Sequence, residues 1–249
     1  MSRLFAIGDV HLPSTRNKDM HRFGWDAHPE PLRAAWDEQV KPDDYVVVAG
    51  DISWATRPTE VLDDLAWLDA RPGRKVLLKG NHDYWWGDSA SKLTRLLQPY
   101  ASFIGFLHNK AVRAGPYLIA GSRLWTTPEA PSMPGGEMGD EVQKTDYVER
   151  ESRRLQASFD DARRQEQEAG QKGEQLRRVA AVHFPPVYSN GLDTAFSKLV
   201  EGFQPEVCVY GHLHGPGISA GFVGPRNGTR YVLASCDAAG FKPVLLLEG

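Results

Sequence analysis

The feature of this 249-residue sequence that most constrains its fold is a series of short apolar runs, each followed closely by polar side chains. The runs are rich in Val, Ile and Leu, which is typical of strands buried on both faces of a sheet. Five such runs occur, at Leu4–Ile7, Tyr45–Ala49, Val76–Leu78, Val179–Val182 and Val207–Tyr210. The sequence therefore predicts a sheet in which these segments are neighbouring strands.

Segments with a helical spacing of apolar residues lie between these runs, and further strand candidates occur later in the chain. We expect helices at Pro31–Val40, Pro58–Ala70, Ser89–Leu97 and Asp193–Phe203. Gly and Pro turns separate further strand candidates at Ala101–Asn109, Ala111–Arg113, Tyr117–Ala120, Ile218–Val223, Tyr231–Ser235 and Val244–Leu247. Strands with interleaved helices predict a layered α/β fold with both sheet faces covered.

The charge and cysteine content exclude several classes of protein. Lys plus Arg is 29 and Asp plus Glu is 32, so the net charge of −3 argues against a broad basic face for duplex nucleic acid, though not against a local groove. Cys208 and Cys236 are too few for a disulfide framework. No apolar run approaches the roughly 20 residues of a membrane span, and no signal peptide is evident. We expect a soluble cytoplasmic protein with neither a membrane partner nor an obligate nucleic-acid partner.

One segment departs from the alternation of strands and helices. Residues 126–139 are rich in Pro and Gly and predict a loop, and residues 146–170 predict a polar helix. Nine acidic and nine basic residues lie within residues 141–178, which favours a solvated helix face and leaves a basic binding surface as the alternative. We expect a single domain over residues 1–249, within which residues 126–178 form a loop-plus-helix flap.

The residues that follow the five runs have side chains able to bind a metal ion. They are Asp9 and His11, Asp51, Asn81 with His82 and Asp83, His183, and His212 with His214. The carboxyl ends of parallel strands lie along one edge of a sheet, so these side chains are expected to converge. Each motif alone is more often a turn or a hydrogen-bonded core histidine, but all five occur in register at strand ends.

The donor set contains carboxylate, amide and imidazole groups and no thiolate. It suits Mn²⁺, Fe, Zn²⁺ or Ni²⁺ better than Cu(I) or an all-oxygen Ca²⁺ site. The seven candidate ligands are Asp9, His11, Asp51, Asn81, His183, His212 and His214. Seven ligands are too many for one ion and enough for two ions that share a carboxylate. We therefore expect two divalent or trivalent metal ions, with Mn²⁺ the ion of choice in vitro.

Taken together, the five blocks resemble the signature of the calcineurin-like metallophosphoesterases. The blocks are Asp9-Val-His11, Gly50-Asp51, Gly80-Asn81-His82-Asp83, His183 and Gly211-His212-Leu-His214. The resemblance implies a four-layer αββα sandwich with a mixed sheet core. It also implies the ligand sets: Asp9, His11 and His214 for one ion, Asn81, His183 and His212 for the other, and Asp51 as the bridge.

The family resemblance further implies a mechanism, in which a hydroxide that bridges the two ions hydrolyses a phosphate ester. His82 resembles the family's catalytic histidine, which protonates the leaving group, and Asp83 would orient its ring. The Ser/Thr protein phosphatases of this superfamily carry Asp-Arg-Gly in the second block and Glu in the third. This chain has Asp51-Ile52-Ser53 and Asp83 instead, so it resembles the bacterial-type branch.

The sequence constrains the substrate less closely. Aromatic residues that could line a pocket or pack the rim of the sheet lie near the motifs, at Trp54, Tyr84, Trp85, Trp86 and Trp125. An aromatic rim suits the second ester group of a phosphodiester, such as that of a nucleotide, and no basic residue follows Asp51 before Arg57. Arg123 reaching in from another strand would favour the alternative, a phosphomonoesterase. A non-catalytic scaffold is the third alternative, and the oligomeric state is left open.

Overall fold

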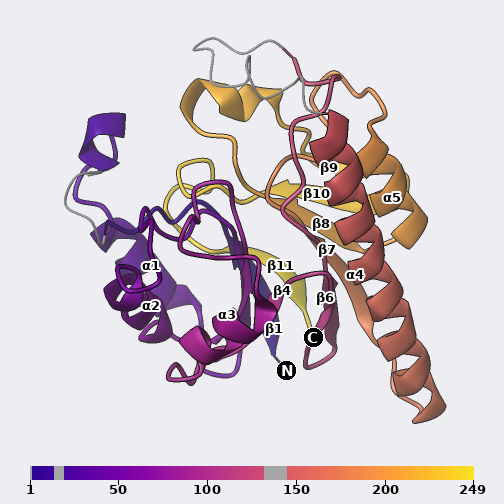
Figure 1. The fold of residues 1–249 in the computed structure, drawn as a ribbon, viewed down its shortest axis with the longest axis horizontal. Coiled ribbons are helices and arrows are strands. Elements are labelled where there is room, and N and C mark those ends of the chain that lie inside the picture. Colours follow the sequence, from indigo (N-terminus) through magenta and orange to yellow (C-terminus); the bar gives the residue numbers. More distant parts are fainter. Residues whose placement is uncertain (1, 14–19, 132–144) are drawn as a thin grey trace.

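The computed structural model describes residues 2–13, 20–131 and 145–249, which form two β-sheets packed face to face with helices on both outer surfaces (Figure 1). The first sheet has the strand order β11-β1-β2-β3-β4, and the second has the order β5-β6-β7-β8-β10-β9. Each sheet contains both parallel and antiparallel pairs. The expected four-layer αββα sandwich of the α/β class is confirmed.

The first sheet carries the three N-terminal strand ends of the predicted site. Its strands are β1 (Arg3–Ile7), β2 (Tyr45–Ala49), β3 (Arg74–Leu78), β4 (Phe103–Leu107) and β11 (Val244–Glu248). The first four are parallel, and β11 is antiparallel to β1. Its outer face is covered by α1 (Glu30–Gln39), α2 (Leu62–Asp69) and α3 (Ala90–Leu97), and η1 (Met20–Phe23) precedes α1 in the chain.

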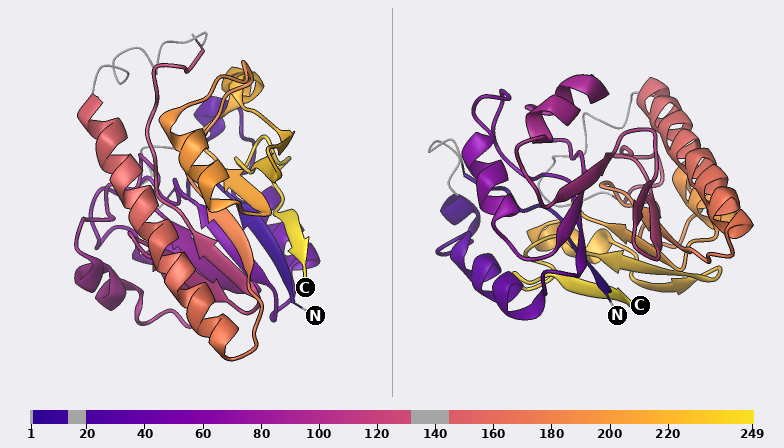
Figure 2. Two further views of the ribbon diagram at one scale, coloured as in Figure 1. Left: turned by 90° about the vertical axis from the view of Figure 1, so that its right-hand side faces the viewer. Right: turned by 90° about the horizontal axis from the view of Figure 1, so that it is seen from below.

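The second sheet carries the two remaining strand ends. Its strands are β5 (Val112–Ala114), β6 (Tyr117–Ala120), β7 (Arg177–Ala181), β8 (Val207–Tyr210), β9 (Gly224–Arg226) and β10 (Thr229–Leu233). The central four are parallel, and the short edge strands β5 and β9 are antiparallel to their neighbours. Helices α4 (Thr145–Gln171) and α5 (Ala195–Phe203) lie side by side on its outer face (Figure 2).

The apolar runs are continuous because the central strands are buried on both faces. In β2, Val46 and Val48 pack against the helices of the first sheet, whereas Val47 packs between the two sheets. The same alternation places Phe5 of β1 under the helices and Ala6 in the inner layer. A strand with two buried faces has no polar side, which is why its sequence pattern lacks a period of two.

The two sheets come together where their parallel strands end. Gly8, just past β1, forms a parallel bridge with Ser235, just past β10, and its amide donates to the carbonyl of Ala234 at 2.6 Å. Nδ1 of His183, which follows β7, lies 2.9 Å from the carbonyl oxygen of Ala49 in β2. The strand ends of both sheets therefore share one edge of the sandwich.

Two of the expected elements are corrected by the structure. Ile218–Val223 is not a strand, because a 3₁₀ helix, η2 (Gly215–Ala220), occupies its first half. Pro216 in the first turn of η2 has no N–H to give to a sheet, and its fixed φ suits a helical turn. The helix expected from Pro58 begins only at Leu62, since the Glu60 carboxylate accepts the amides of Thr56 and Arg57 and holds a separate turn there.

The expected polar helix is confirmed as α4, and one side of it is firmly packed. Leu155, Phe159 and Ala162 are fully buried against the second sheet. The loop expected before this helix includes residues 132–139, which lie outside the described residues. The flap over residues 126–178 therefore stays a prediction, as does the single-domain assignment over 1–249.

Candidate metal centre

Four of the candidate ligands lie in turns whose backbone conformation is rare for residues with a side chain. Asp9, His11, Asp51 and His212 have φ values of 56°, 47°, 51° and 71°. Such left-handed turns cost roughly 1 kcal/mol or more each and persist only where surrounding contacts hold them. The amide of Asp9 donates to the carbonyl of Gly50 at 2.8 Å, and that of His11 donates to the carbonyl of Asp51 at 2.9 Å. These turns direct the side chains into the shared edge.

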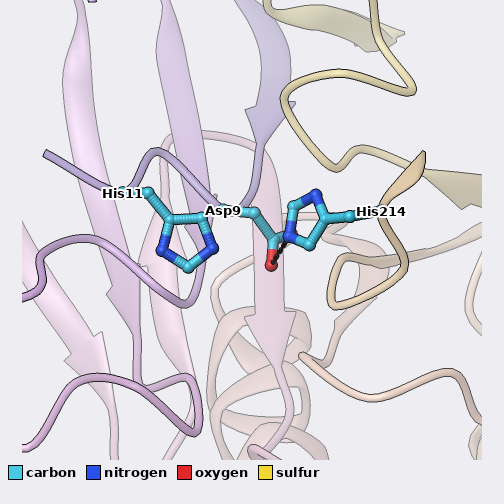
Figure 3. Close-up of side chains that lie close together, drawn as sticks. All are labelled: Asp9, His11 and His214. Carbon is cyan, nitrogen blue, oxygen red and sulfur yellow. Dashed lines mark ion pairs between the residues drawn. The ribbon is translucent and has the colours of Figure 1, made fainter. Parts of the chain in front are cut away.

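Asp9, His11 and His214 form the first group of candidate ligands (Figure 3). Their ligand atoms all lie within 4.8 Å of one another, and the two imidazole rings flank the Asp9 carboxylate. Asp9 is fully buried, and its Oδ1 lies 3.0 Å from Nε2 of His214. The backbone amide of His212 donates to Asp9 Oδ2 at 2.8 Å. The first sheet and the second sheet thus both contribute to this group.

Asn81, His183 and His212 form the second group, gathered around the Asn81 amide oxygen. Nε2 of His183 lies 2.7 Å from Asn81 Oδ1, and Nδ1 of His212 lies 3.1 Å from it. Asp51 lies between the groups, because its Oδ2 is 3.5 Å from Nε2 of His183 and 3.9 Å from Nε2 of His11. This is the position that a bridging carboxylate needs.

Two glycines leave the space that the carboxylates occupy. A Cβ atom at Gly80 would lie 2.0 Å from Oδ1 of Asp51, and one at Gly211 would lie 2.3 Å from Oδ2 of Asp9. Atoms do not approach this closely, so any other residue would displace the carboxylate. The glycines before Asn81 and His212 are therefore required by the packing of the site itself.

The two buried carboxylates are kept ionised by the imidazoles around them. Burial alone would raise the pKa of Asp9 and of Asp51. His214 outweighs burial at Asp9, and His183 with His11 outweighs it at Asp51, so both pKa values lie below the usual range for aspartate. Two negative charges are thus concentrated in the interior of the edge.

The histidines of the two groups differ in their affinity for protons. Burial lowers the pKa of His11 and of His212 to about 3, which favours the neutral ring that a metal ion requires. Burial also acts against protonation of His183 and His214, but Asp51 and Asp9 outweigh it and raise their pKa values to about 9 and about 10. A cation bound here would compensate the same carboxylates and release those protons.

The residues of the edge fit a pair of metal ions. The donor set of two carboxylates, one amide and four imidazoles is the mixed oxygen and nitrogen set that Mn²⁺, Fe, Zn²⁺ and Ni²⁺ favour. Nδ1 of His11 is buried and has no hydrogen-bond partner within residues 2–13, 20–131 and 145–249. Among the described residues, all seven sequence-predicted ligands are brought together at this edge.

His82 lies beside the candidate ligands and stays open to solvent. Its side chain is 33% exposed, its Nε2 lies 4.0 Å from Oδ2 of Asp51, and its backbone amide donates to Asp51 Oδ1 at 2.8 Å. The ring centre lies 4.6 Å from that of Trp54. An imidazole in this position can exchange a proton with a bound molecule, which a fully buried ligand cannot do.

Asp83, beside His82 in the sequence, is anchored by backbone amides of the site. Its carboxylate accepts the backbone amides of Gly80, Ile52 and Ser53 at 2.8–3.2 Å and the indole N–H of Trp85 at 3.0 Å. The expected role of Asp83 in orienting the His82 ring stays a prediction. Burial, and then the charge of Asp51, raises the pKa of Asp83 to about 6. Asp83 therefore ties the turn after β2 to the loop that carries Asn81 and His82.

Two cavities of different chemistry adjoin the site, and His82 lines both of them. The basic cavity has a volume of about 450 Å³ and contains the cationic side chains of Lys79, Arg123, Arg150 and Arg154. The aromatic cavity has a volume of about 280 Å³ and is lined by rings of the first sheet's loops and of η1, with Phe23, Trp25 and Trp54 among them. A molecule bound at His82 can extend into either cavity.

The five aromatic residues near the motifs lie in different environments. Trp85 and Trp86 are 1% exposed and belong to the core under the helices, so they form no rim. Trp54 lines the aromatic cavity and stacks on His11 with ring centres 4.5 Å apart. Tyr84 and Trp125 line the basic cavity. The structure thus supports pocket lining for three of the five and core packing for two.

The structure adds site residues that the sequence analysis missed. Oδ1 of Asp237 lies 3.0 Å from Nδ1 of His214, so this carboxylate orients a candidate ligand. Asp237 lies four residues past β10, which is parallel to β8 and ends at the same edge. Its position after a predicted strand is the sequence signal that could have identified Asp237 as a site residue. Arg150 and Arg154 carried no such signal, because a helix rich in both charges gave no reason to single them out.

Comparison with known proteins agrees with this geometry. The family model of the calcineurin-like phosphoesterases matches residues 2–216. The chain belongs to this family. Gene 66 proteins of the mycobacterial phages D29 and L5 are 39% and 36% identical to it over 83 and 85 residues. Each match covers 33% of this chain and 41% of the phage protein, so less than half of either relative is represented.

Solved structures agree in fold at low sequence identity. A phosphopantetheinyl hydrolase of Mycobacterium tuberculosis has a TM-score of 0.55 and 16% identity, with 100% of this chain and 96% of that chain covered. The protein TT1561 of Thermus thermophilus has a TM-score of 0.51 and 11% identity, with 99% of both chains covered. At this identity the comparison establishes the fold.

None of the described helices is long and apolar enough to cross a bilayer.

Proposed function

We propose that this chain is a metal-dependent phosphoesterase with a binuclear centre. The observation that carries the proposal is the convergence of seven oxygen and nitrogen donors from five strand ends, two of which are buried carboxylates. Asp9, His11 and His214 would hold one ion, Asn81, His183 and His212 would hold the other, and Asp51 would bridge them. Two such ions would act as Lewis acids toward a phosphoryl group and would supply a reactive water at neutral pH. We propose Mn²⁺ as the ion for measurements in vitro.

The remaining residues would act on the substrate and on the loops. His82 would donate a proton to the departing ester oxygen, since its ring is partly exposed and lies beside Asp51. Asp83 would orient the His82 ring, and its hydrogen bonds hold the turn at Ile52 and Ser53 against the loop at Gly80.

Within this class we propose that the substrate is a phosphodiester. Since His82 lines both cavities, a phosphorus atom bound beside it has space for a substituent on each side. A diester has two substituents, and a monoester has only one. A monoesterase is the second candidate, because Arg123 lines the same cavity as Asn81 and His82 and could hold the additional charge of a monoester.

Two measurements test the proposal. Elemental analysis of purified variants should find both ions reduced in Asp51→Asn but chiefly one ion reduced in His11→Ala; two full equivalents of metal in Asp51→Asn would refute the bridging role. The metal-loaded protein should hydrolyse bis-p-nitrophenyl phosphate with a higher kcat/KM than p-nitrophenyl phosphate. A kcat/KM about tenfold higher on the monoester would establish the second candidate, and hydrolysis of neither ester would count against the function.

A further inference from the structure

The basic cavity holds more positive charge than the proposed hydrolysis needs. It adjoins Asn81 and His82, yet three of its four cationic side chains, Arg123, Arg150 and Arg154, come from outside the five strand ends. Arg123 follows β6, and the other two project from the N-terminal half of α4. When the substrate is a phosphodiester, its phosphoryl group at the metal centre leaves these groups without an assigned role.

One buried carboxylate holds the three guanidinium groups together. Oε1 of Glu151, whose side chain is 1% exposed, lies 3.3 Å from Arg123, 3.6 Å from Arg150 and 2.9 Å from Arg154. One negative charge among three positive charges leaves an excess of two, and the charges of Lys79 and Asp83, which also line the cavity, are of opposite sign. Asp88 compensates little of this excess, because its side chain is 87% exposed and lies 3.9 Å from Arg154.

Aromatic faces fix the planes of two of these guanidinium groups. Arg123 lies over the Trp125 ring at 4.7 Å and Arg150 over the Tyr147 ring at 4.3 Å, and the two rings stack on each other at 4.8 Å. Stacking occupies the faces of a guanidinium group and leaves the N–H groups at its edge available. Nε of Arg123 is buried without a hydrogen-bond partner in the described part of the chain. The site is therefore built in advance and retains unused donors.

We propose that the basic cavity binds a second phosphate group of the substrate, so that the enzyme acts on phosphate esters that carry a further phosphate beside the ester that is cleaved. The inference rests on the proposed function. A phosphate group has several oxygen atoms that can each accept N–H groups from more than one guanidinium, and it carries the charge that the cluster lacks. The chain as a whole has a net charge of −3, so this attraction is local to the cavity.

A pair of substrates that differ in one phosphate tests the inference. The probes are thymidine 5′-(4-nitrophenyl phosphate) and the same compound with a 3′-phosphate, both of which release p-nitrophenol. The metal-loaded protein should have a kcat/KM at least about tenfold higher on the 3′-phosphorylated ester. Arg154→Gln and Arg150→Gln should each reduce this preference by about tenfold, because each removes charged donors. Their kcat/KM on the ester without the 3′-phosphate should change little.

Arg153→Gln is the matched control, since it removes the same charge from the same helix. Arg153 is 73% exposed, pairs with Glu149 and does not line the cavity, so the preference should persist in this variant. Equal activity of the unmodified protein on the two esters, or an equal loss of preference in Arg153→Gln, would overturn the inference. It would be overturned equally if both cavity variants lost activity on the two esters alike.

A binding measurement separates this inference from the proposed function. Calorimetry should find that the metal-loaded protein binds thymidine 3′,5′-bisphosphate about tenfold more tightly than thymidine 5′-monophosphate, and that Arg154→Gln abolishes the difference. This outcome would support the cavity even if neither ester were hydrolysed, a result that would refute the phosphoesterase proposal alone. Equal dissociation constants for the two nucleotides would refute the cavity assignment while leaving hydrolysis intact.

Discussion

The two cavities beside His82 are held together by different physical means. In the basic cavity, three guanidinium groups share the carboxylate of Glu151 and two of them stack on aromatic faces, so like charges are held close to one another. Around the aromatic cavity, Trp25 packs edge to face against His214 and Phe241, with ring centres 5.5 Å and 5.2 Å apart, whereas Trp54 stacks on His11. The basic cavity therefore suits a bound anion, which would balance its positive charge. The aromatic cavity presents apolar surface to a ligand.

This difference suggests a division of recognition between the two sides of the site. The basic cavity draws its cations mainly from α4 and the end of β6, whereas the aromatic cavity is made by loops of the first sheet, η1 and the start of η2. Substitutions on one side should therefore weaken the binding of one part of the substrate and leave the binding of the other part unaffected. The four predictions that follow test that separation, in order of decreasing expected effect.

The largest effect is expected for His82→Ala, because His82 is common to both cavities. We expect kcat to fall by about 10²-fold or more on every substrate, while elemental analysis finds the metal content unchanged. His21→Ala is the control, since the His21 side chain is 71% exposed, pairs with Asp26 and lines neither cavity. Loss of metal from His82→Ala would make His82 a ligand and remove its role as proton donor.

A smaller effect, on metal affinity, is expected for Asp237→Asn. Asp237 lines the aromatic cavity and contacts Nδ1 of His214, so its carboxylate both orients that ring and increases its basicity. The dissociation constant of the ion held by Asp9, His11 and His214 should rise by about 10- to 100-fold, and that of the other ion should change little. Equal weakening of both ions in a metal titration would contradict the two separate groups.

Trp54→Leu should have a moderate effect confined to one side. The substitution removes aromatic surface from the aromatic cavity, so KM for bis-p-nitrophenyl phosphate should rise by about tenfold. The preference for a 3′-phosphorylated nucleotide ester, which we assign to the basic cavity, should persist. If this preference falls together with the affinity for the aromatic diester, the two cavities do not act separately.

The smallest effect is expected from salt. Raising NaCl from about 0.05 M to about 0.5 M shortens the screening length and weakens attraction between charged groups that are exposed to solvent. Because Arg150 and Arg154 are 40% and 32% exposed, KM for the 3′-phosphorylated ester should rise a few-fold. KM for bis-p-nitrophenyl phosphate should stay nearly constant, and an equal response of both substrates would argue against a charge-based cavity.

The sequence predicted which side chains meet at the shared edge, because their signal is local. Each lies within a few residues of the end of an apolar run, and the parallel arrangement of the strands determines where those ends meet. The fold class followed from the same pattern, since strands buried on both faces require covering layers on each side. The distribution of the runs between two sheets was not visible in these segments themselves.

The side chains around the ligands were harder to predict because their positions depend on tertiary packing. Nothing in the motif indicated that the Asp83 carboxylate accepts the amides of Gly80, Ile52 and Ser53. Trp85 and Trp86 looked like rim residues from their nearness to the motif, yet the chain turns them into the core. The cluster around Glu151 joins α4 to the end of β6. This contact could not be predicted from a short motif, because its residues are distant in the sequence.

The hydrogen bond from the amide of His212 to Asp9 joins residues 203 positions apart, and this separation determines when the site can exist. At the usual rate of synthesis, about 5–20 residues per second, the later residue emerges roughly 10–40 seconds after the earlier one. During that interval the nascent chain presents Asp9 and His11 without His214, so an ion could be held only weakly. Metal acquisition should therefore be among the last events of maturation, after the second sheet has closed against the first.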